Sequence, residues 1–158
     1  GHCIAVDPYF IIDSCQEEST LISAARNVNN SKPKFVLDQI KEAISEIEKD
    51  ISEINICCLG LSFKPNIDDL RESPALDIAE EISKMSFKNI YIVEPNINIL
   101  PSVFNQTKSK LTSLDDAIAM SDVVIVLVDH DDFKLLSSDK ISSKIVIDTR
   151  GIFIKKSK

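Results

Sequence analysis

Hydrophobic positions follow two different rhythms along the chain, and the rhythm changes near residue 52. Before that point, apolar residues recur at intervals of three and four, which is the spacing of an amphipathic helix. This spacing predicts a helix over residues 16–30. It also predicts a longer helix beginning near Pro33, with an apolar stripe at Phe35, Val36, Ile40, Ala43, Ile44, Ile47 and Ile51. Residues 4–12 are predicted to be a short extended lead-in.

These first elements cannot close a hydrophobic core by themselves. Two helices and an extended segment leave the apolar stripe without a partner, which must be either the following domain or another subunit. The stripe is too long to be covered by one small domain. We therefore predict a homodimer that forms through the helical region.

From residue 53 onward, apolar runs alternate with helical segments. Strands are predicted over residues 54–61, 89–93, 122–128 and 144–147, and helices over residues 74–85, 114–120 and 132–136. The strands are continuously apolar, which indicates burial on both faces, as in a parallel sheet. Strand–helix–strand alternation predicts an α/β fold with a doubly wound, mainly parallel, Rossmann-like sheet. Residues 1–52 would form the helical region and residues 53–158 the α/β domain.

Composition narrows the class of protein. The 158 residues are 44% hydrophobic and 27% charged, both ordinary values for a globular chain. A net charge of −7, with no basic stripe, argues against duplex nucleic acid or an anionic membrane as partner. No apolar run is long enough to span a membrane. Among the four cysteines, none of which has zinc or redox spacing, adjacent Cys57 and Cys58 should point to opposite faces of a strand. We expect reduced thiols in a cytoplasmic protein.

Ligands of such sheets bind beyond the carboxyl ends of the strands. The first strand is followed by the single glycine Gly60, so the G-x-G-x-x-G turn is absent and we do not expect this sheet to bind NAD. Phe63 and Lys64 come next, an aromatic ring beside a cation, which suits a nucleotide, although a charged surface loop is the alternative. Arg150 follows the fourth strand. We expect Lys64 and Arg150 to converge on one anion.

Three other positions are open to a functional or a structural interpretation. Glu94 follows the second strand and would either bind ribose hydroxyls or begin a turn. Asp129 suggests a phosphoacceptor or a metal ligand, but we favour an N-cap of the following helix and predict no metal site. A receiver-like domain would need an acidic pair after the first strand, and the sequence has none there. Cys3, beside His2 and four residues before Asp7, is either incidental or a nucleophile.

Long motifs resemble the UDP-glucose/GDP-mannose dehydrogenase family. Residues 1–10, GHCIAVDPYF, resemble its catalytic cysteine segment, and residues 63–74, FKPNIDDLRESP, resemble its nucleotide-sugar segment. The resemblance extends over essentially the whole chain, including VEPN at 93–96 and VLVDH at 126–130. DTRG at 148–151 stands where D-A-K-G is expected, so the cation is retained.

The resemblance implies an enzyme of three parts: an NAD-binding domain, a helical dimerising middle and a C-terminal UDP-binding domain. This chain would comprise the end of the middle part and the UDP-binding domain, and we expect it to lack dehydrogenase activity alone. The implied reaction oxidises a sugar C6 alcohol to a carboxylate with two NAD+, through a cysteine thiohemiacetal and thioester. The motifs are most similar to members that act on UDP-N-acetyl-D-mannosamine. UDP-N-acetylglucosamine and UDP-glucose are alternative substrates, and a non-catalytic nucleotide-sugar binding module is an alternative function.

The family's residue roles fall on matching positions of this sequence. The resemblance implies that Cys3 is the nucleophile, that Asp7 orients water or accepts a proton, that Phe63, Lys64 and Arg150 bind the UDP-sugar, and that Arg71 reaches NAD. NAD itself would be bound mainly by the N-terminal domain.

Overall fold

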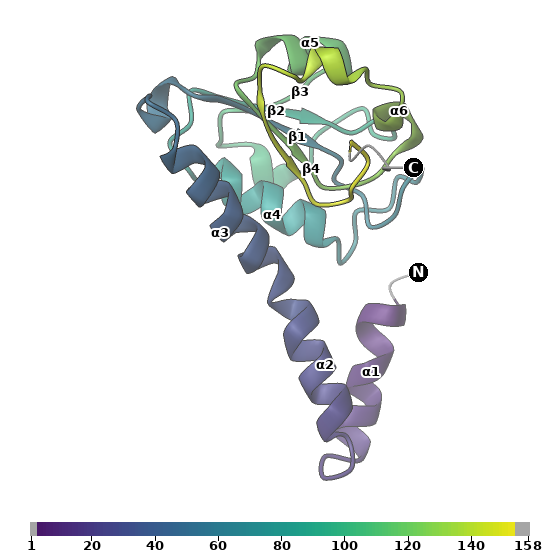
Figure 1. Cartoon of the computed structure of the whole chain (residues 1–158). Coiled ribbons are helices and arrows are strands. Elements are labelled where there is room, and N and C mark those ends of the chain that lie inside the picture. Colours follow the sequence, from purple (N-terminus) through teal and green to yellow (C-terminus); the bar gives the residue numbers. More distant parts are fainter. Residues whose placement is uncertain (1–2, 154–158) are drawn as a thin grey trace, which may run out of the picture.

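The computed structural model describes residues 3–153 and shows an α/β part from which a helical arm extends (Figure 1). The arm, residues 3–30, consists of α1 (Cys3–Ser14) and α2 (Thr20–Asn30). The other helices are α3 (Lys32–Ser45), α4 (Pro74–Ser83), α5 (Leu114–Met120) and α6 (Asp131–Lys134). The strands are β1 (Asn55–Leu59), β2 (Asn89–Val93), β3 (Ser109–Leu111), β4 (Val123–Val126) and β5 (Ile145–Asp148). In residues 3–153 no helix combines the length and the apolar content needed to cross a membrane.

The sheet confirms the predicted doubly wound topology. Its five strands are parallel and lie in the order β3-β2-β1-β4-β5. Helices α3 and α4 cover one face, and α5 and α6 cover the other (Figure 1). The central strands are almost entirely buried because helices pack on both sides, which explains their unbroken hydrophobic sequences.

The two cysteines of β1 show how the sheet divides the core. Cys57 packs with the cluster beneath α5 and α6, and Cys58 with the cluster beneath α3 and α4. This confirms the prediction that their side chains point to opposite faces. Burial raises the pKa of Cys58 to about 12 and that of Cys57 well above its ordinary value, so both thiols stay protonated as small hydrophobic side chains.

The predicted strands are correct in position but too long in two cases, and one strand was not predicted. Leu61, Leu127 and Val128 are buried although they lie beyond the ends of β1 and β4, so hydrophobicity continues past the hydrogen-bonded ladder. Strand β3 is short, has the sequence Ser-Lys-Leu and lies at the sheet edge, so it lacks the apolar signal of a buried strand.

The predicted extended lead-in is wrong, because residues 4–12 lie within helix α1. β-Branched residues and Pro8 disfavour a helix, and Pro8 removes one hydrogen bond inside it. Helix α1 nevertheless packs antiparallel against α2 as a helical hairpin (Figure 1). The hydroxyl of Tyr9 also accepts a hydrogen bond of 2.7 Å from the amide of Asn30. Tertiary packing therefore outweighs the local preference.

The apolar stripe has its partner within the chain. Ile40 is fully buried, and Val36, Ile44, Ile47 and Ile51 pack against the core under α4. The argument that one small domain cannot cover the stripe is therefore wrong, since only Phe35 of its large residues stays exposed. The predicted domain division at residue 52 is untested, but α3 packs on α4 and β5 and thus belongs physically to the α/β part.

The close approach of β1 and β4 at their carboxyl ends generates a prediction. Gly60 has a φ of +93°, and a Cβ atom there would lie 2.4 Å from the Cβ of Val128. We expect Gly60→Ala to lower the free energy of unfolding by about 2–4 kcal/mol through this overlap and backbone strain. Gly151→Ala is the matched control: its φ is +71° but the residue is exposed, so only the strain, about 1 kcal/mol, should be lost. Urea unfolding measures both, and equal losses would contradict the overlap.

Candidate functional site

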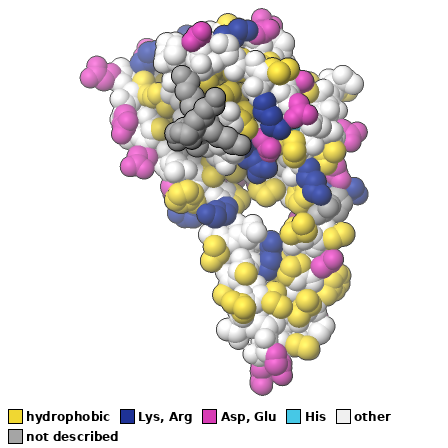
Figure 2. All heavy atoms as spheres, turned by 45° about the vertical axis from the view of Figure 1, so that its right-hand side comes forward, with side chains coloured by type: hydrophobic (Ala, Val, Ile, Leu, Met, Phe, Trp, Pro, Cys, Tyr) yellow, Lys and Arg dark blue, Asp and Glu magenta, His cyan; other side chains and the backbone are white. Residues whose placement is uncertain are grey.

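A cleft of about 460 Å³ lies between the α/β part and the helical arm. Strand order reverses between β1 and β4, and the cleft opens beyond the carboxyl ends of β1, β4 and β5, where such folds bind ligands. The sheet contributes Ser62, Phe63, Leu127, Val128 and Arg150, and the arm contributes Ile4, Ala5, Tyr9, Arg26, Asn29 and Asn30. The surface is visibly hollowed where the arm joins the α/β part (Figure 2).

A buried carboxylate organises the backbone at the carboxyl ends of the strands. Glu94, which follows β2, is 3% exposed. Its Oε2 accepts hydrogen bonds from the backbone N–H groups of Leu61 (2.8 Å) and Ser62 (3.1 Å) in the turn after β1. Its Oε1 accepts from the backbone and the side chain of Asn96, both at 3.2 Å. Glu94 thus binds the amides that in a dinucleotide-binding sheet would face a pyrophosphate, so the residues present here do not fit NAD at this edge.

His130 completes the network from the end of β4. Its Nδ1 lies 2.9 Å from the backbone nitrogen of Asn66, and because an amide N–H can only donate, Nδ1 must accept. The ring proton therefore sits on Nε2, which is 3.1 Å from Oε2 of Glu94. The contact is a hydrogen bond from a neutral imidazole to a carboxylate.

Ser62, His130 and Glu94 meet, but they do not form a nucleophile–base–acid set. The hydroxyl of Ser62 and the carboxylate of Glu94 both face Nε2, at 3.2 and 3.1 Å, whereas such a set needs one partner on each ring nitrogen. The hydroxyl of Ser62 also has the carbonyl of Lys64 within 2.7 Å, and all three residues are buried. The network is structural.

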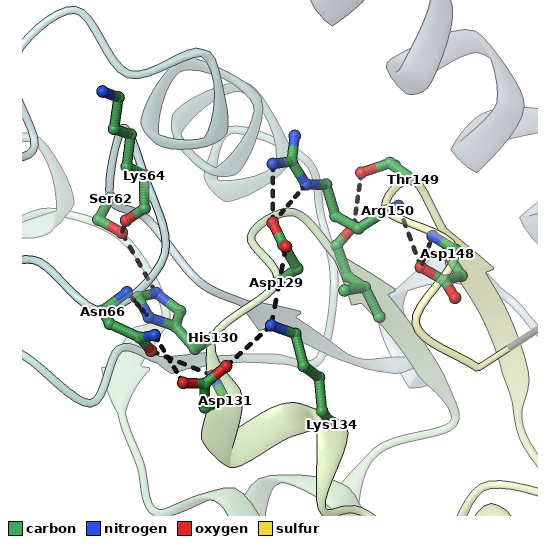
Figure 3. A network of polar contacts seen from close by, with 12 residues as sticks. Ser62, Lys64, Asn66, Asp129, His130, Asp131, Lys134, Asp148, Thr149 and Arg150 are labelled. Carbon is green, nitrogen blue, oxygen red and sulfur yellow. Dashed lines mark hydrogen bonds and ion pairs between the residues drawn. The ribbon is translucent and has the colours of Figure 1, made fainter. Parts of the chain in front are cut away.

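The loop that follows β1 is fastened to the start of α6. Asn66 has a left-handed φ of +62°. Its side-chain amide donates to Asp131 at 2.8 Å, and its side-chain oxygen accepts from the backbone N–H of Asp131 at 3.1 Å (Figure 3). The N–H of Phe63 donates to the carbonyl of Asp69 at 2.9 Å, which closes the loop on itself. These bonds fix the backbone that carries Phe63.

The hydrogen bonds around Glu94 also set its ionisation. Burial raises the pKa of this carboxyl, but hydrogen bonds from His130 and from the N–H of Leu61 outweigh burial and hold the pKa below its ordinary value of 4.5. Glu94 is therefore ionised at neutral pH.

The sequence suggested that Asp129 is the N-cap of the following helix, and this prediction is wrong. The N-cap position of α6 is occupied by His130, whose side chain makes no capping bond. Oδ1 of Asp129 accepts from Nε (2.9 Å) and Nη2 (2.7 Å) of Arg150 (Figure 3). Burial raises the pKa of Asp129, and the guanidinium of Arg150 more than reverses this, so Asp129 is ionised and compensates the charge of Arg150.

The predicted convergence of two cations is only partly visible. Phe63 and Arg150 both line the cleft, whereas Lys64 is exposed, lies outside that lining and extends away from His130 (Figure 3). Arg71 is also outside the lining, and its Nε and Nη2 pair with the two carboxylate oxygens of Asp69 at 2.9 and 2.8 Å.

Cys3 and Asp7 occupy the first two turns of α1, where a separation of four residues places them on one helix face. Both are exposed, and Ile4 and Ala5, directly after Cys3, line the cleft. His2, expected beside the thiol, lies outside the described residues. Within residues 3–153 no three His, Cys, Asp or Glu side chains cluster in a way that could hold a metal ion.

Sequence reasoning missed the buried link between Glu94 and His130. A partial signal exists: Glu94 stands directly after β2, and His130 follows shortly after the apolar run that contains β4. These two strands flank β1, and the carboxyl ends of parallel strands lie at one edge of the sheet. Arg26 was also missed, because nothing in its local sequence indicates that α2 faces the sheet.

Comparison with known proteins shows which family this chain resembles. Residues 57–155 match the family model described as "UDP-glucose/GDP-mannose dehydrogenase family, UDP binding domain". The chain is 46% identical over 157 residues to UDP-N-acetyl-D-mannosamine dehydrogenase of Salmonella typhi, covering 97% of this chain and 37% of that protein. It is 44% identical over 156 residues to NDP-N-acetyl-D-galactosaminuronic acid dehydrogenase of Ralstonia nicotianae, covering 99% of this chain and 36% of the relative.

A solved structure agrees with these sequence relatives. The chain superposes on UDP-D-ManNAc dehydrogenase from Pyrococcus horikoshii with a TM-score of 0.79 and 31% identity, over 99% of this chain and 36% of the other. The chain thus spans little more than a third of the length of these relatives.

The buried carboxylate makes stability depend on acid pH. The pKa of Glu94 is lowered by folding, so its contribution is fully present above the ordinary value of 4.5 and is lost as pH falls through the lower folded pKa. We expect Glu94→Gln to lower the free energy of unfolding by about 2–4 kcal/mol at pH 7, because donors in the turn after β1 lose a charged acceptor.

The difference between Glu94→Gln and the unsubstituted chain should shrink between pH 5 and pH 3, as measured by denaturant unfolding at each pH. Asp38→Asn serves as a control, because this carboxylate pairs with Lys34 on the surface and its loss should change stability little. A difference that stays constant with pH would contradict an ionised Glu94.

Proposed function

The chain belongs to the UDP-glucose/GDP-mannose dehydrogenase family, and from this premise we propose that it binds the nucleotide part of a UDP-sugar in the cleft described above. One observation carries the proposal: an aromatic ring and a guanidinium, Phe63 and Arg150, line the same cleft at the carboxyl ends of parallel strands. Both lie within the segment that matches the family's UDP-binding domain.

The side chains divide the work by their chemistry. Phe63 offers an aromatic face to the uracil or the ribose, from a loop held rigid by the bonds of Asn66 and Asp69. The guanidinium of Arg150 is oriented by Asp129 and presents its remaining N–H groups to the diphosphate. Lys64 adds a flexible cation at the rim, where its ammonium can reach a phosphate once the nucleotide is bound.

We further propose UDP-N-acetyl-D-mannosamine as the sugar, oxidised at C6 to the uronate. Relatives named for this substrate support it, as does the retained cation at Arg150. UDP-N-acetylglucosamine and UDP-glucose are the competing substrates. A relative at 44% identity is named for a third sugar, a galactosaminuronic acid.

In this proposal Cys3 is the nucleophile that carries the oxidised C6 carbon, and Asp7, one helical turn further on, orients the water that releases it. NAD supplies the oxidising chemistry. The edge of this sheet does not fit NAD, so we assign its binding to other residues of the whole protein, with Arg71 reaching it from this chain. The four cysteines, all free thiols, are consistent with a reducing compartment, and we propose a cytoplasmic location.

The nucleotide site predicts opposite effects of two substitutions on UDP affinity. Lys64→Ala removes a charge-assisted contact worth about 1.5–3 kcal/mol and should weaken UDP by roughly tenfold to a hundredfold. Asp129→Asn leaves Arg150 without its compensating carboxylate and should tighten UDP by roughly threefold to tenfold.

Titration calorimetry of UDP against the 158-residue chain measures both effects. Lys88→Ala is the control, because Lys88 is exposed just before β2, at the opposite edge of the sheet. An unchanged affinity in Lys64→Ala would remove Lys64 from the site, and failure of the unsubstituted chain to bind UDP would contradict the proposed function.

We also propose a homodimer, now through the arm instead of the apolar stripe. Large apolar side chains remain exposed on α1 and α2, among them Ile4, Phe10, Ile11, Leu21 and Val28. They form much of the surface of the lower part of the molecule (Figure 2). Two copies that cover these faces would remove them from water.

The arm interface predicts a dimeric mass by light scattering at about 50 micromolar, a concentration at which a micromolar dimer is mostly assembled. Replacing Leu21 (82% exposed) and Val28 (63% exposed) by Glu should shift the mass to the monomer, since charge would be buried in the interface. Leu135→Glu, at a position 84% exposed after α6, should leave the mass unchanged. A monomeric unsubstituted chain would contradict the dimer.

A further inference from the structure

A second guanidinium faces the cleft from the arm. Nη2 of Arg26 on α2 donates to Oδ1 of Asn30 at 2.7 Å, and the guanidinium carbon lies 5.6 Å from the centre of the Tyr9 ring on α1. The amide of Asn30 in turn donates to the hydroxyl of Tyr9 at 2.7 Å. The three side chains form one cluster, and all three line the cleft. The arm therefore presents Arg26 in a fixed position.

Arg26 and Arg150 differ in how their charges are compensated. The side-chain Nε and Nη2 of Arg150 both donate to the carboxylate of Asp129. The partners of Arg26 are a neutral amide and an aromatic ring. Nε of Arg26 is buried and has no hydrogen-bond partner among the described residues. Of the two arginines that line the cleft, Arg26 is therefore the one that has no carboxylate partner among the described residues.

Acidic groups in the lining do not change this result. Glu72 and Asp77 also line the cleft, but neither forms an ion pair with Arg26 in the part of the chain that the structure describes. Burial and the nearby charges of Glu80 and Glu72 raise the pKa of Asp77. The hydrogen bond from Asn30 and the neighbouring guanidinium of Arg26 lower the pKa of Tyr9.

The position of Arg26 relates it to the reacting end of the ligand. The arm side of the cleft also carries Ile4 and Ala5, which directly follow Cys3. The proposed function places C6 of the sugar at Cys3 and the nucleotide at Phe63 and Arg150. Oxidation converts the neutral C6 alcohol into a carboxylate, so the new negative charge would arise on the arm side.

We propose that Arg26 binds the carboxylate of the uronate product and makes the cleft distinguish the oxidised sugar from the alcohol. The inference rests on the proposed function and extends it to a residue of the arm. A planar guanidinium matches a carboxylate with two parallel hydrogen bonds. Tyr9 and Asn30 hold the group in place before the ligand arrives, which reduces the conformational entropy lost on binding.

The test compares three ligands of the 158-residue chain by titration calorimetry: UDP, UDP-N-acetyl-D-mannosamine and its uronate. The unsubstituted chain should bind the uronate roughly tenfold or more tightly than the alcohol, the size of one charge-assisted contact. Arg26→Gln should abolish this preference while the affinity for UDP stays within about twofold. Lys34→Gln is the matched control, because it removes one positive charge from the neighbouring helix α3 outside the cleft and should keep the preference.

Each outcome decides a different statement. Binding of UDP without any preference for the uronate, or a preference that survives Arg26→Gln, would overturn the role of Arg26 and leave the nucleotide site standing. Absence of UDP binding by the unsubstituted chain would overturn the proposed function and this inference together.

A second measurement follows the binding of both ligands to the unsubstituted chain and uses a variant only to assign one resonance. The chain has three arginines, Arg26, Arg71 and Arg150, so its side-chain Nε–H spectrum is simple. Arg26→Lys identifies the Arg26 resonance by its disappearance. In the unsubstituted chain this resonance should shift when the uronate is added and stay in place when the alcohol is added at the same occupancy. No difference between the two ligands would contradict the contact.

Discussion

The buried carboxylate of Glu94 is the contact on which the ligand-binding edge depends. An ionised group can be buried only when hydrogen bonds replace its water, and here they come from the backbone of Leu61, Ser62 and Asn96 and the side chains of Asn96 and His130. These donors belong to the segments that follow β1, β2 and β4. A single side chain therefore holds three strand ends in register. It also satisfies backbone N–H groups that would otherwise be buried without an acceptor.

The carboxylate of Glu94 occupies the position where a dinucleotide-binding sheet of this type binds a phosphate. In a dinucleotide-binding sheet, the turn after the first strand is open to a phosphate, whereas here Glu94 already binds its amides. Gly60 leaves too little space for a side chain beside Val128, so the turn lies close against β4. The chain beyond this turn is displaced into the loop that carries Phe63. The remaining opening is the cleft between that loop, Arg150 and the arm, where we propose that the nucleotide binds.

The two arginines of the cleft differ in whether a carboxylate compensates their charge. Arg150 lies beside Asp129, so this pair presents oriented N–H groups with little net charge. Arg26 is held by neutral partners and keeps its full charge. A ligand whose charge changes during the reaction would be sensed by the second group more than by the first. The α/β part thus contributes geometry, and the arm contributes the response to charge.

Hydrophobic periodicity alone determined the α/β class, the position of the central strands and the opposite faces of Cys57 and Cys58, because burial on both sides of a parallel sheet leaves a local mark on the sequence. Long motifs predicted the family, and they singled out Phe63 and Arg150, which the structure shows to line one cleft. Only the tertiary structure decided that residues 4–12 are helical, that the apolar stripe is covered by the chain itself, and that Asp129 pairs with Arg150. Glu94 and His130 are 36 residues apart in the sequence, and Asp129 and Arg150 are 21 apart. Such pairs depend on strand order and on which loop ends meet at one edge, and no local pattern of residues records that information.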